Sequence, residues 1–280
     1  MNKTTTYEPD NSIKKGYISL WKEITWELKH NKWLTYQLFK RDFFAIYKQS
    51  LVGVFWAFIV PIASVGTFII LNRSGIFNIG EIEVPYPIYA ILGMAFWQLF
   101  SNGLITTSNS LVKAGSMLVK INFSKKSLVF SSAAQSLIPF MVQIILVGIL
   151  FVAYQVYPSV KILFFPFLML PIIFLTLGLG FILSLFSSVV RDISTALSVF
   201  MTFLMFLTPV LYAKPKIGAL APLTKFNPLY YLISMPRELV LKGTISEGKG
   251  YLLSAGLSFL FFVVGLVIFH LTETRITERL

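Results

Sequence analysis

Six long uncharged runs of apolar residues, separated by polar segments, occupy most of this chain. A helix of about 20 apolar residues spans the roughly 30 Å of hydrocarbon in a bilayer, and each run reaches that length. The runs cover residues 51–71, 88–108, 131–154, 162–190, 193–213 and 250–272. The pattern predicts an all-α polytopic membrane protein with six transmembrane helices, and we expect residues 51–280 to form this transmembrane domain.

The polar segment 1–50 contains a second kind of pattern. Tyr17, Leu20, Trp21, Ile24 and Leu28 recur at helical spacing, and charged residues occupy the positions between them. This periodicity predicts an amphipathic helix that lies in the membrane surface with Trp at the headgroup boundary. A helix packed on protein would show the same pattern.

Residues 214–249 are too apolar for a free loop and too interrupted for two further spans. Asn227 suits an N-cap and Pro228 the first helical turn, which predicts a short helix through Leu241, kinked near Pro236. We expect a shorter helix around residues 217–223 to precede it. Such a pair of re-entrant helices would shield an exit on the outer face.

The loop 109–126 between the second and third runs is amphipathic as well. Apolar residues alternate there with Lys113, Lys120, Lys125 and Lys126. A short helix with this pattern suits docking onto a soluble partner, and it equally suits binding to anionic lipid.

The net charge of +12 is distributed by side of the membrane. Most of the 24 Lys and Arg residues lie in the N-terminal segment, in the loop 109–126, at Arg191 and after the last run. The positive-inside rule therefore predicts that both termini are cytoplasmic, which an even number of spans also requires. We therefore interpret the excess of positive charge as a signal of membrane topology, and we expect no nucleic-acid partner.

The sequence lacks the residues that ion-coupled transport, metal binding and nucleotide binding require. No Asp, Glu, Lys or Arg lies within the six runs, whereas ion-coupled carriers keep at least one such group. The chain has no Cys, and neither His30 nor His270 has a neighbour at metal-ligand spacing, so we predict no metal site. Residues 243–249 match the start of a P-loop, but Gly250 stands where Ser or Thr would hold magnesium. We expect no cofactor in this chain and an external source of energy.

A set of residues in a fixed order carries a family resemblance. They are Arg41, Asp42, Tyr47 to Leu51, Gly53, Trp56, Pro61, Pro87, Tyr89, Gly93, Trp97, Phe100, Arg191 to Ile193, Pro209 to Tyr212, Asn227, Pro228 and Tyr231. From about Trp33 to the end, the chain resembles the permease subunits of ABC transporters that export O-antigen, some capsules and teichoic acids. One departure is Phe123-Ser124-Lys125, where the family often has Phe-Pro and a basic residue.

The resemblance implies a homodimer that works with two separate ABC ATPase subunits, which would bind ATP and magnesium. The chain itself would be a transporter subunit and not an enzyme. By this resemblance its substrate would be a polysaccharide, with O-antigen expected, carried on an undecaprenyl-type lipid in the cytoplasmic (inner) membrane. The N-terminal amphipathic helix would be an interface helix. The loop 109–126 would couple to the ATPase through Leu111, Met117, Leu118, Lys120 and Phe123. The segment 214–249 would form the outer gate with Asn227, Pro228, Tyr231 and Arg237.

A moving polymer must be held weakly at many places, and aromatic rings offer flat apolar faces to sugars. The candidate channel residues are Phe55, Trp56, Tyr89, Phe96, Trp97, Gln98, Phe100, Asn102, Phe203, Phe206 and Tyr212. Aromatic residues also face lipid, and Gln98 and Asn102 could bond between helices instead of binding hydroxyl groups. At the cytoplasmic rim, Arg41, Asp42, Arg191 and Asp192 could meet a pyrophosphate headgroup or brace helix ends. Bracing is the favoured role for the last two.

Two alternative functions remain. A permease of the same class for teichoic acid, drugs or small amphipathic lipids would share the topology. A membrane-embedded transferase would need a polar catalytic cluster near one membrane face, and no His–Asp or paired-carboxylate pattern of that kind is visible.

Overall fold

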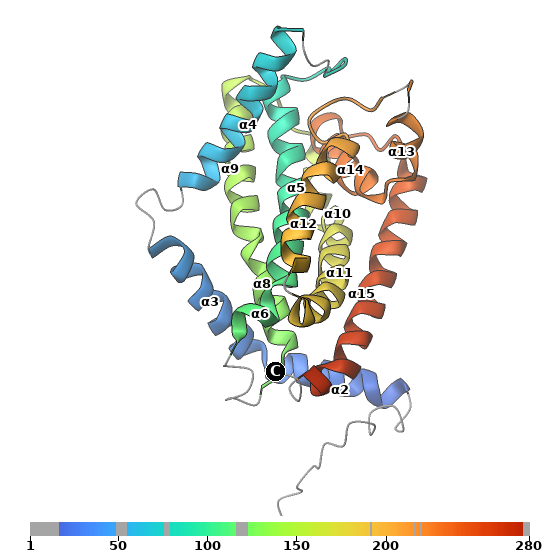
Figure 1. The fold of residues 1–280 in the computed structure, drawn as a ribbon. Helices are drawn as coiled ribbons and strands as arrows, with labels where there is room; N and C mark the ends of the chain where they lie inside the picture. Colours follow the sequence, from blue (N-terminus) through green and yellow to red (C-terminus); the bar gives the residue numbers. More distant parts are fainter. Residues whose placement is uncertain are drawn as a thin grey trace, which may run out of the picture.

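The computed structural model describes residues 17–48, 55–75, 79–115, 123–190, 192–215, 217–218 and 220–276. Every regular element in these ranges is a helix, which confirms the predicted fold class. Figure 1 shows long helices standing side by side, with short helices at both ends. The long helices are α4 (Trp56–Arg73), α5 (Tyr86–Ser108), α8 (Lys126–Gln135), which leads into α9 (Leu137–Ala153), α11 (Leu170–Val189), α12 (Asp192–Leu207) and α15 (Gly248–Ile276).

The two ends of the molecule carry different additional helices (Figure 1). One end, called here the α2 end, carries α2 (Tyr17–His30), α3 (Lys32–Lys48) and α6 (Ser110–Ala114). The other, called the α14 end, carries α13 (Leu220–Phe226) and α14 (Pro228–Lys242), and η2 (Val160–Phe164) and α10 (Phe165–Leu168) pack against α14. The predicted helix after Asn227 is confirmed, and the one before it begins at Leu220 rather than near residue 217.

Four segments of the described chain are long and apolar enough to cross a membrane. They are Tyr86–Ser108, Lys126–Ala153, Val160–Val189 and Gly248–Glu273. The predicted first and fifth spans contain shorter apolar helices, Phe58–Arg73 and Asp192–Leu207. The fifth apolar run continues to Ala213, but its helix ends at Leu207 because Pro209 cannot donate a helical hydrogen bond.

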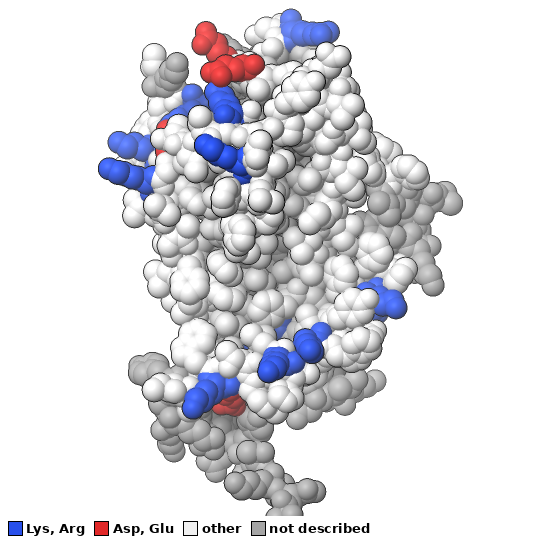
Figure 2. All heavy atoms as spheres, turned by 180° about the vertical axis from the view of Figure 1, so that it is seen from behind, with Lys and Arg blue, Asp and Glu red and all other residues white. Residues whose placement is uncertain are grey.

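On the face seen in Figure 2, charged side chains avoid the middle of the molecule. Figure 2 shows them gathered toward the two ends of the visible face, with an uncharged band between them. Burying unpaired charge in hydrocarbon is costly, so the uncharged band is where a bilayer core fits.

Helix α5 forms the centre of the helical bundle. In its apolar window 78% of the residues are buried, compared with 28% in α15, so α15 lies at the periphery. The α5 residues pack with α9, α11 and α14 in the larger of two apolar clusters. Where α11 meets α15, a Cβ on Gly265 would overlap the carbonyl oxygen of Gly178, so the two backbones touch.

The predicted amphipathic helix is α2, and it packs on protein on one face only. Leu20 and Ile24 are buried in the second apolar cluster, with residues of α8, α11 and α15. Ile18, Trp21 and Trp26 remain exposed on α2. The helix therefore combines both interpretations of its pattern: one face joins the core, and the other is free to contact a membrane surface.

Candidate functional site

A buried ionic cluster ties three helices together at the α2 end. Lys126, at the start of α8, is fully buried, and its Nζ donates to Glu27 Oε2 of α2 at 2.7 Å. The same ammonium group also binds Glu273 Oε1 of α15. One lysine thereby connects the N-terminal helix, the exit of the loop 109–126 and the end of the last long helix.

Two neighbours complete this cluster. Lys125 donates to the backbone carbonyl of Glu273, and burial lowers the pKa of the Lys125 ammonium. His270 is buried with its Nδ1 3.4 Å from Glu273 Oε1, so it lies within this cluster. Ligand atoms of Glu27, His270 and Glu273 lie within 4.8 Å of one another, but the Lys126 ammonium already binds both carboxylates. The cluster is therefore an ion-pair network with its own cation.

The predicted coupling residues divide between the core and the undescribed part of the chain. Leu111 is buried on α6, and Phe123 packs against the same second apolar cluster. Met117, Leu118 and Lys120 lie outside the described residues. The two ends of the loop 109–126 are therefore anchored by apolar packing and by Lys126.

The predicted rim residues lie on different helices. Arg41 donates through Nε to Asp42 Oδ1 at 2.7 Å, and this pair is largely exposed on α3. Asp192 is exposed in the first turn of α12, where its negative charge interacts favourably with the positive end of the helix dipole. Arg191 lies outside the described residues.

At the α14 end, Asn227 and Arg237 hold α14 in place. Asn227 caps α14 by accepting from Leu229 N at 3.0 Å, and its Nδ2 donates to Thr208 Oγ1 at 2.8 Å. Pro228 follows in the first turn, as predicted. The Tyr231 hydroxyl donates to the carbonyl of Lys225 at 2.8 Å, which joins α14 to α13.

Arg237 is the most enclosed charged group at this end, with 4% of its surface exposed. It donates to the carbonyls of Val210 at 2.7 Å and Pro209 at 3.3 Å, and its guanidinium lies 3.8 Å from the ring centroid of Tyr89. A Cβ on Gly93 would lie only 2.6 Å from the guanidinium, so this glycine makes room for it. Arg237 thus fastens α14 to α5 and to the turn after α12.

The aromatic residues of the predicted channel occupy two environments. Phe96, Trp97 and Phe100 are buried in the larger apolar cluster, where they pack helix against helix. Tyr89 and Tyr212 are partly buried and joined to each other, because the Tyr89 hydroxyl donates to the Tyr212 carbonyl at 3.1 Å.

The other members of the set are exposed on the long helices. Phe55 and Trp56 are exposed at the start of α4, and Phe203 and Phe206 are exposed on α12. Both helices contact α5, which lies between them in Figure 1. Asn102 of α5 is also exposed. These five residues are the members of the predicted set that are free, in one chain, to meet a ligand or a second protein.

Gln98 bonds between helices, as one of its two predicted roles required. Its Oε1 accepts from Gln143 Nε2 of α9 at 2.7 Å, and Gln143 is fully buried. Sequence reasoning missed Gln143, Glu27 and Glu273 as functional candidates. Glu273 stands three residues after His270, and this helical spacing was the one local signal available.

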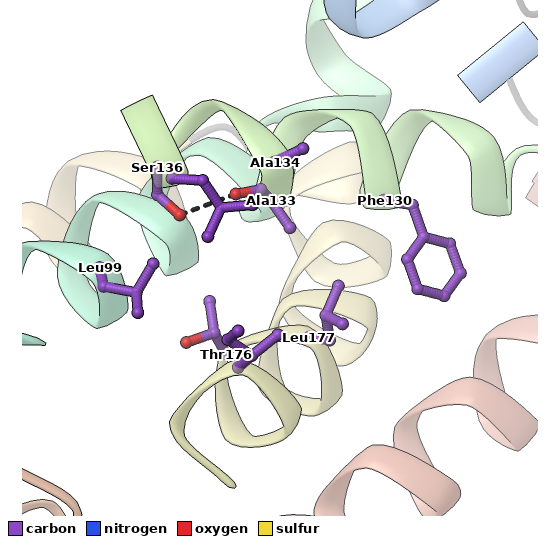
Figure 3. Close-up of a pocket in the computed structure, with 9 residues that line it drawn as sticks. Leu99, Phe130, Ala133, Ala134, Ser136, Thr176 and Leu177 are labelled. Carbon is purple, nitrogen blue, oxygen red and sulfur yellow. Dashed lines mark hydrogen bonds between the residues drawn. The ribbon is translucent and has the colours of Figure 1, made fainter. Parts of the chain in front are cut away.

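An apolar pocket of about 180 Å³ lies where α8 gives way to α9, between α5 and α11 (Figure 3). Leu99, Phe130, Ala133 and Leu177 are among its lining residues. The Ser136 hydroxyl at its rim donates to the Ala133 carbonyl at 2.7 Å, so it is already satisfied. The lining suits hydrocarbon and does not suit sugar hydroxyls.

Comparison with known proteins places this arrangement in a family. The profile of the family described as ABC-2 type transporter matches residues 34–241. The chain is 24% identical over 261 residues to the O-antigen export system permease protein RfbA of Myxococcus xanthus, covering 91% of this chain and 98% of the relative. It is 25% identical over 245 residues to the RfbA permease of Klebsiella pneumoniae, covering 86% and 92%. Because the family match spans most of the chain, including α4 to α14, this protein belongs to the ABC-2 type transporter family.

Proposed function

We propose that this chain is the channel-forming subunit of an ATP-driven exporter of lipid-linked polysaccharide, with O-antigen as the substrate. Export would run from the cytoplasmic to the outer side of the inner membrane. The observation that carries the proposal is the nearly full-length similarity to O-antigen export permeases from two organisms. An all-helical bundle with a mostly apolar middle agrees with it.

The energy would come from separate ABC ATPase subunits docked at the α2 end. In this orientation both termini and the loop 109–126 are cytoplasmic, and the interface helix α2 lies beside the docking site. The Lys126 cluster supports this role because it links the loop exit to α2 and α15. Movement of the loop would then be transmitted through this ion-pair network directly to α2 and α15.

The translocation path would lie between two copies of this chain. The support is the set of exposed aromatic residues on α4 and α12, which one copy leaves uncovered. Phe55, Trp56, Asn102, Phe203 and Phe206 are the residues we assign to the path or to its rim. The segment 214–249 would close the outer side, held by Asn227 and Arg237.

An exporter of teichoic acid, drugs or small amphipathic lipids is the alternative within the same family. The discriminating measurement is deletion of the gene in a strain without a second copy, followed by separate analysis of surface and cytoplasmic lipid-linked glycans. Loss of one surface polysaccharide, with its lipid-linked form accumulating inside, is the expected result. An unchanged glycan profile would favour the alternative.

A further inference from the structure

A basic hollow lies at the α14 end, apart from the exposed aromatic residues of α4 and α12. It has a volume of about 770 Å³ and lies between α13, α14 and the start of α15. Its lining residues are Lys214, Pro215, Ala221, Lys225, Tyr231, Ser246, Glu247, Gly248, Lys249 and Gly250. Figure 2 shows basic side chains gathered toward this end of the molecule. We call it the outer basic hollow.

The charge of the outer basic hollow is only partly balanced. Lys214 forms an ion pair with Glu247, the one acidic residue in the lining, and it also lies 4.9 Å from the ring centroid of Tyr230. Among the described residues, no carboxylate forms an ion pair with Lys225 or Lys249, and both residues are exposed. The hollow therefore presents two free ammonium groups to whatever enters it.

The start of α15 adds to this positive potential. Gly248, Lys249 and Gly250 form its first turn, where backbone N–H groups have no acceptor within the helix. The positive end of a long helix dipole therefore points toward the same space as the two lysines. Gly250 is required here because a Cβ would overlap the ring of Tyr231. The lining thus combines side-chain and backbone donors around one concave surface.

The exposed face of α13 indicates the depth of the hollow in the membrane. Leu223 and Phe226 of α13 are 52% and 81% exposed, and Lys225 lies between them in the sequence. A helix that exposes apolar side chains beside a lysine settles at the bilayer boundary, where the charged group reaches the headgroups. The anions found at that depth are the phosphate groups of lipids.

We propose that the outer basic hollow binds the phosphate group of a membrane lipid. The volume accommodates a phosphate with part of its headgroup, and the two unpaired lysines supply charge-assisted hydrogen bonds. Two lipids carry this chemistry: an anionic phospholipid of the outer leaflet and a polyprenyl pyrophosphate. The proposal does not require that the chain export polysaccharide.

The test is native mass spectrometry of the purified full-length chain, titrated with phosphatidylglycerol or with a polyprenyl pyrophosphate. Lys225→Gln and Lys249→Gln should each weaken binding about fivefold, because each lysine near a charged lipid surface contributes about that factor. Lys249→Arg keeps the charge and should retain binding. Arg73→Gln removes one positive charge from the same end, outside the lining of the hollow, and should leave binding unchanged.

The outcomes distinguish the two lipids and can also contradict the proposal. Weakened binding of phosphatidylglycerol alone assigns the site to membrane phospholipid, and weakened binding of polyprenyl pyrophosphate alone assigns it to a glycan carrier. Weakened binding of both supports a general lipid-phosphate site. Unchanged binding of both lipids by the two lysine variants would overturn the proposal. An equal loss in Arg73→Gln would also overturn it, because diffuse surface charge would then be sufficient.

Discussion

Each end of this permease has a buried basic side chain at its centre, Lys126 at one end and Arg237 at the other, and the two are satisfied in opposite ways. At the α2 end, Lys126 is held by the carboxylates of Glu27 and Glu273. At the α14 end, Arg237 is held by two backbone carbonyls and the face of Tyr89. The first arrangement is an ion-pair network, whereas the second places a charge among neutral partners.

The difference matters when the basic group is removed. Without Lys126, two carboxylates would remain close together in a poorly hydrated place, which is much costlier than two unpaired carbonyls. The α2 end should therefore be the more sensitive to a single substitution. It is also the end where we propose that the ATPase docks, and there the network would hold together the helices that move with the loop 109–126.

Lys126→Met gives the largest expected effect. We expect it to lower the free energy of unfolding by about 3–5 kcal/mol, because it removes the buried ammonium group that pairs with both carboxylates. Thermal unfolding of the purified chain in detergent would measure this loss. Adding Glu273→Gln should recover part of it, since one of the opposing charges is then removed. A melting temperature equal to that of the wild type would mean that the network does not stabilise the α2 end.

Arg237→Lys gives an intermediate effect. The substitution keeps the charge but removes the planar fork that reaches two carbonyls while lying on Tyr89. We expect a loss of about 1.5–3 kcal/mol, the range for hydrogen bonds to charged groups. Lys242→Arg, on the exposed side of the same helix, serves as the matched control and should unfold like the wild type. If Arg237→Lys left the free energy of unfolding unchanged, the positive charge alone would be sufficient to stabilise the α14 end.

Gln143→Met gives the smallest effect and extends the comparison to the middle of the molecule. It removes the hydrogen bond to Gln98 between α5 and α9 while keeping a side chain of similar length. Interhelical hydrogen bonds in membranes contribute about 0.6 kcal/mol on average, so the unfolding transition should move only slightly. A loss of unfolding free energy as large as that of Arg237→Lys would show that the Gln98–Gln143 hydrogen bond is a major source of stability for the helical bundle.

The sequence was sufficient for features that depend on neighbouring residues. Asn227 and Pro228 predicted the start of α14, because capping needs only the next two or three residues. The pattern of Leu20 and Ile24 predicted α2 for the same reason. The residues of the apolar runs also predicted the fold class without knowledge of how the helices pack.

Features that depend on distant contacts were not predictable in this way. Lys126 meets Glu27 and Glu273 across 99 and 147 positions, so the sequence pattern placed it only among the basic residues of the amphipathic loop 109–126. Aromatic residues share one hydrophobic character whether they face a core, a lipid or a channel. The burial of Phe96, Trp97 and Phe100 therefore followed only from the packing of α5.

Reconstitution of transport would show whether this chain exports a lipid-linked glycan. The purified chain and its partner ATPase would be placed in lipid vesicles together with the lipid-linked polysaccharide, and the glycan on each side of the membrane would be measured with and without ATP. We expect ATP-dependent transfer of the glycan that requires both proteins. ATP hydrolysis that moves a small amphipathic dye but never the glycan would contradict it.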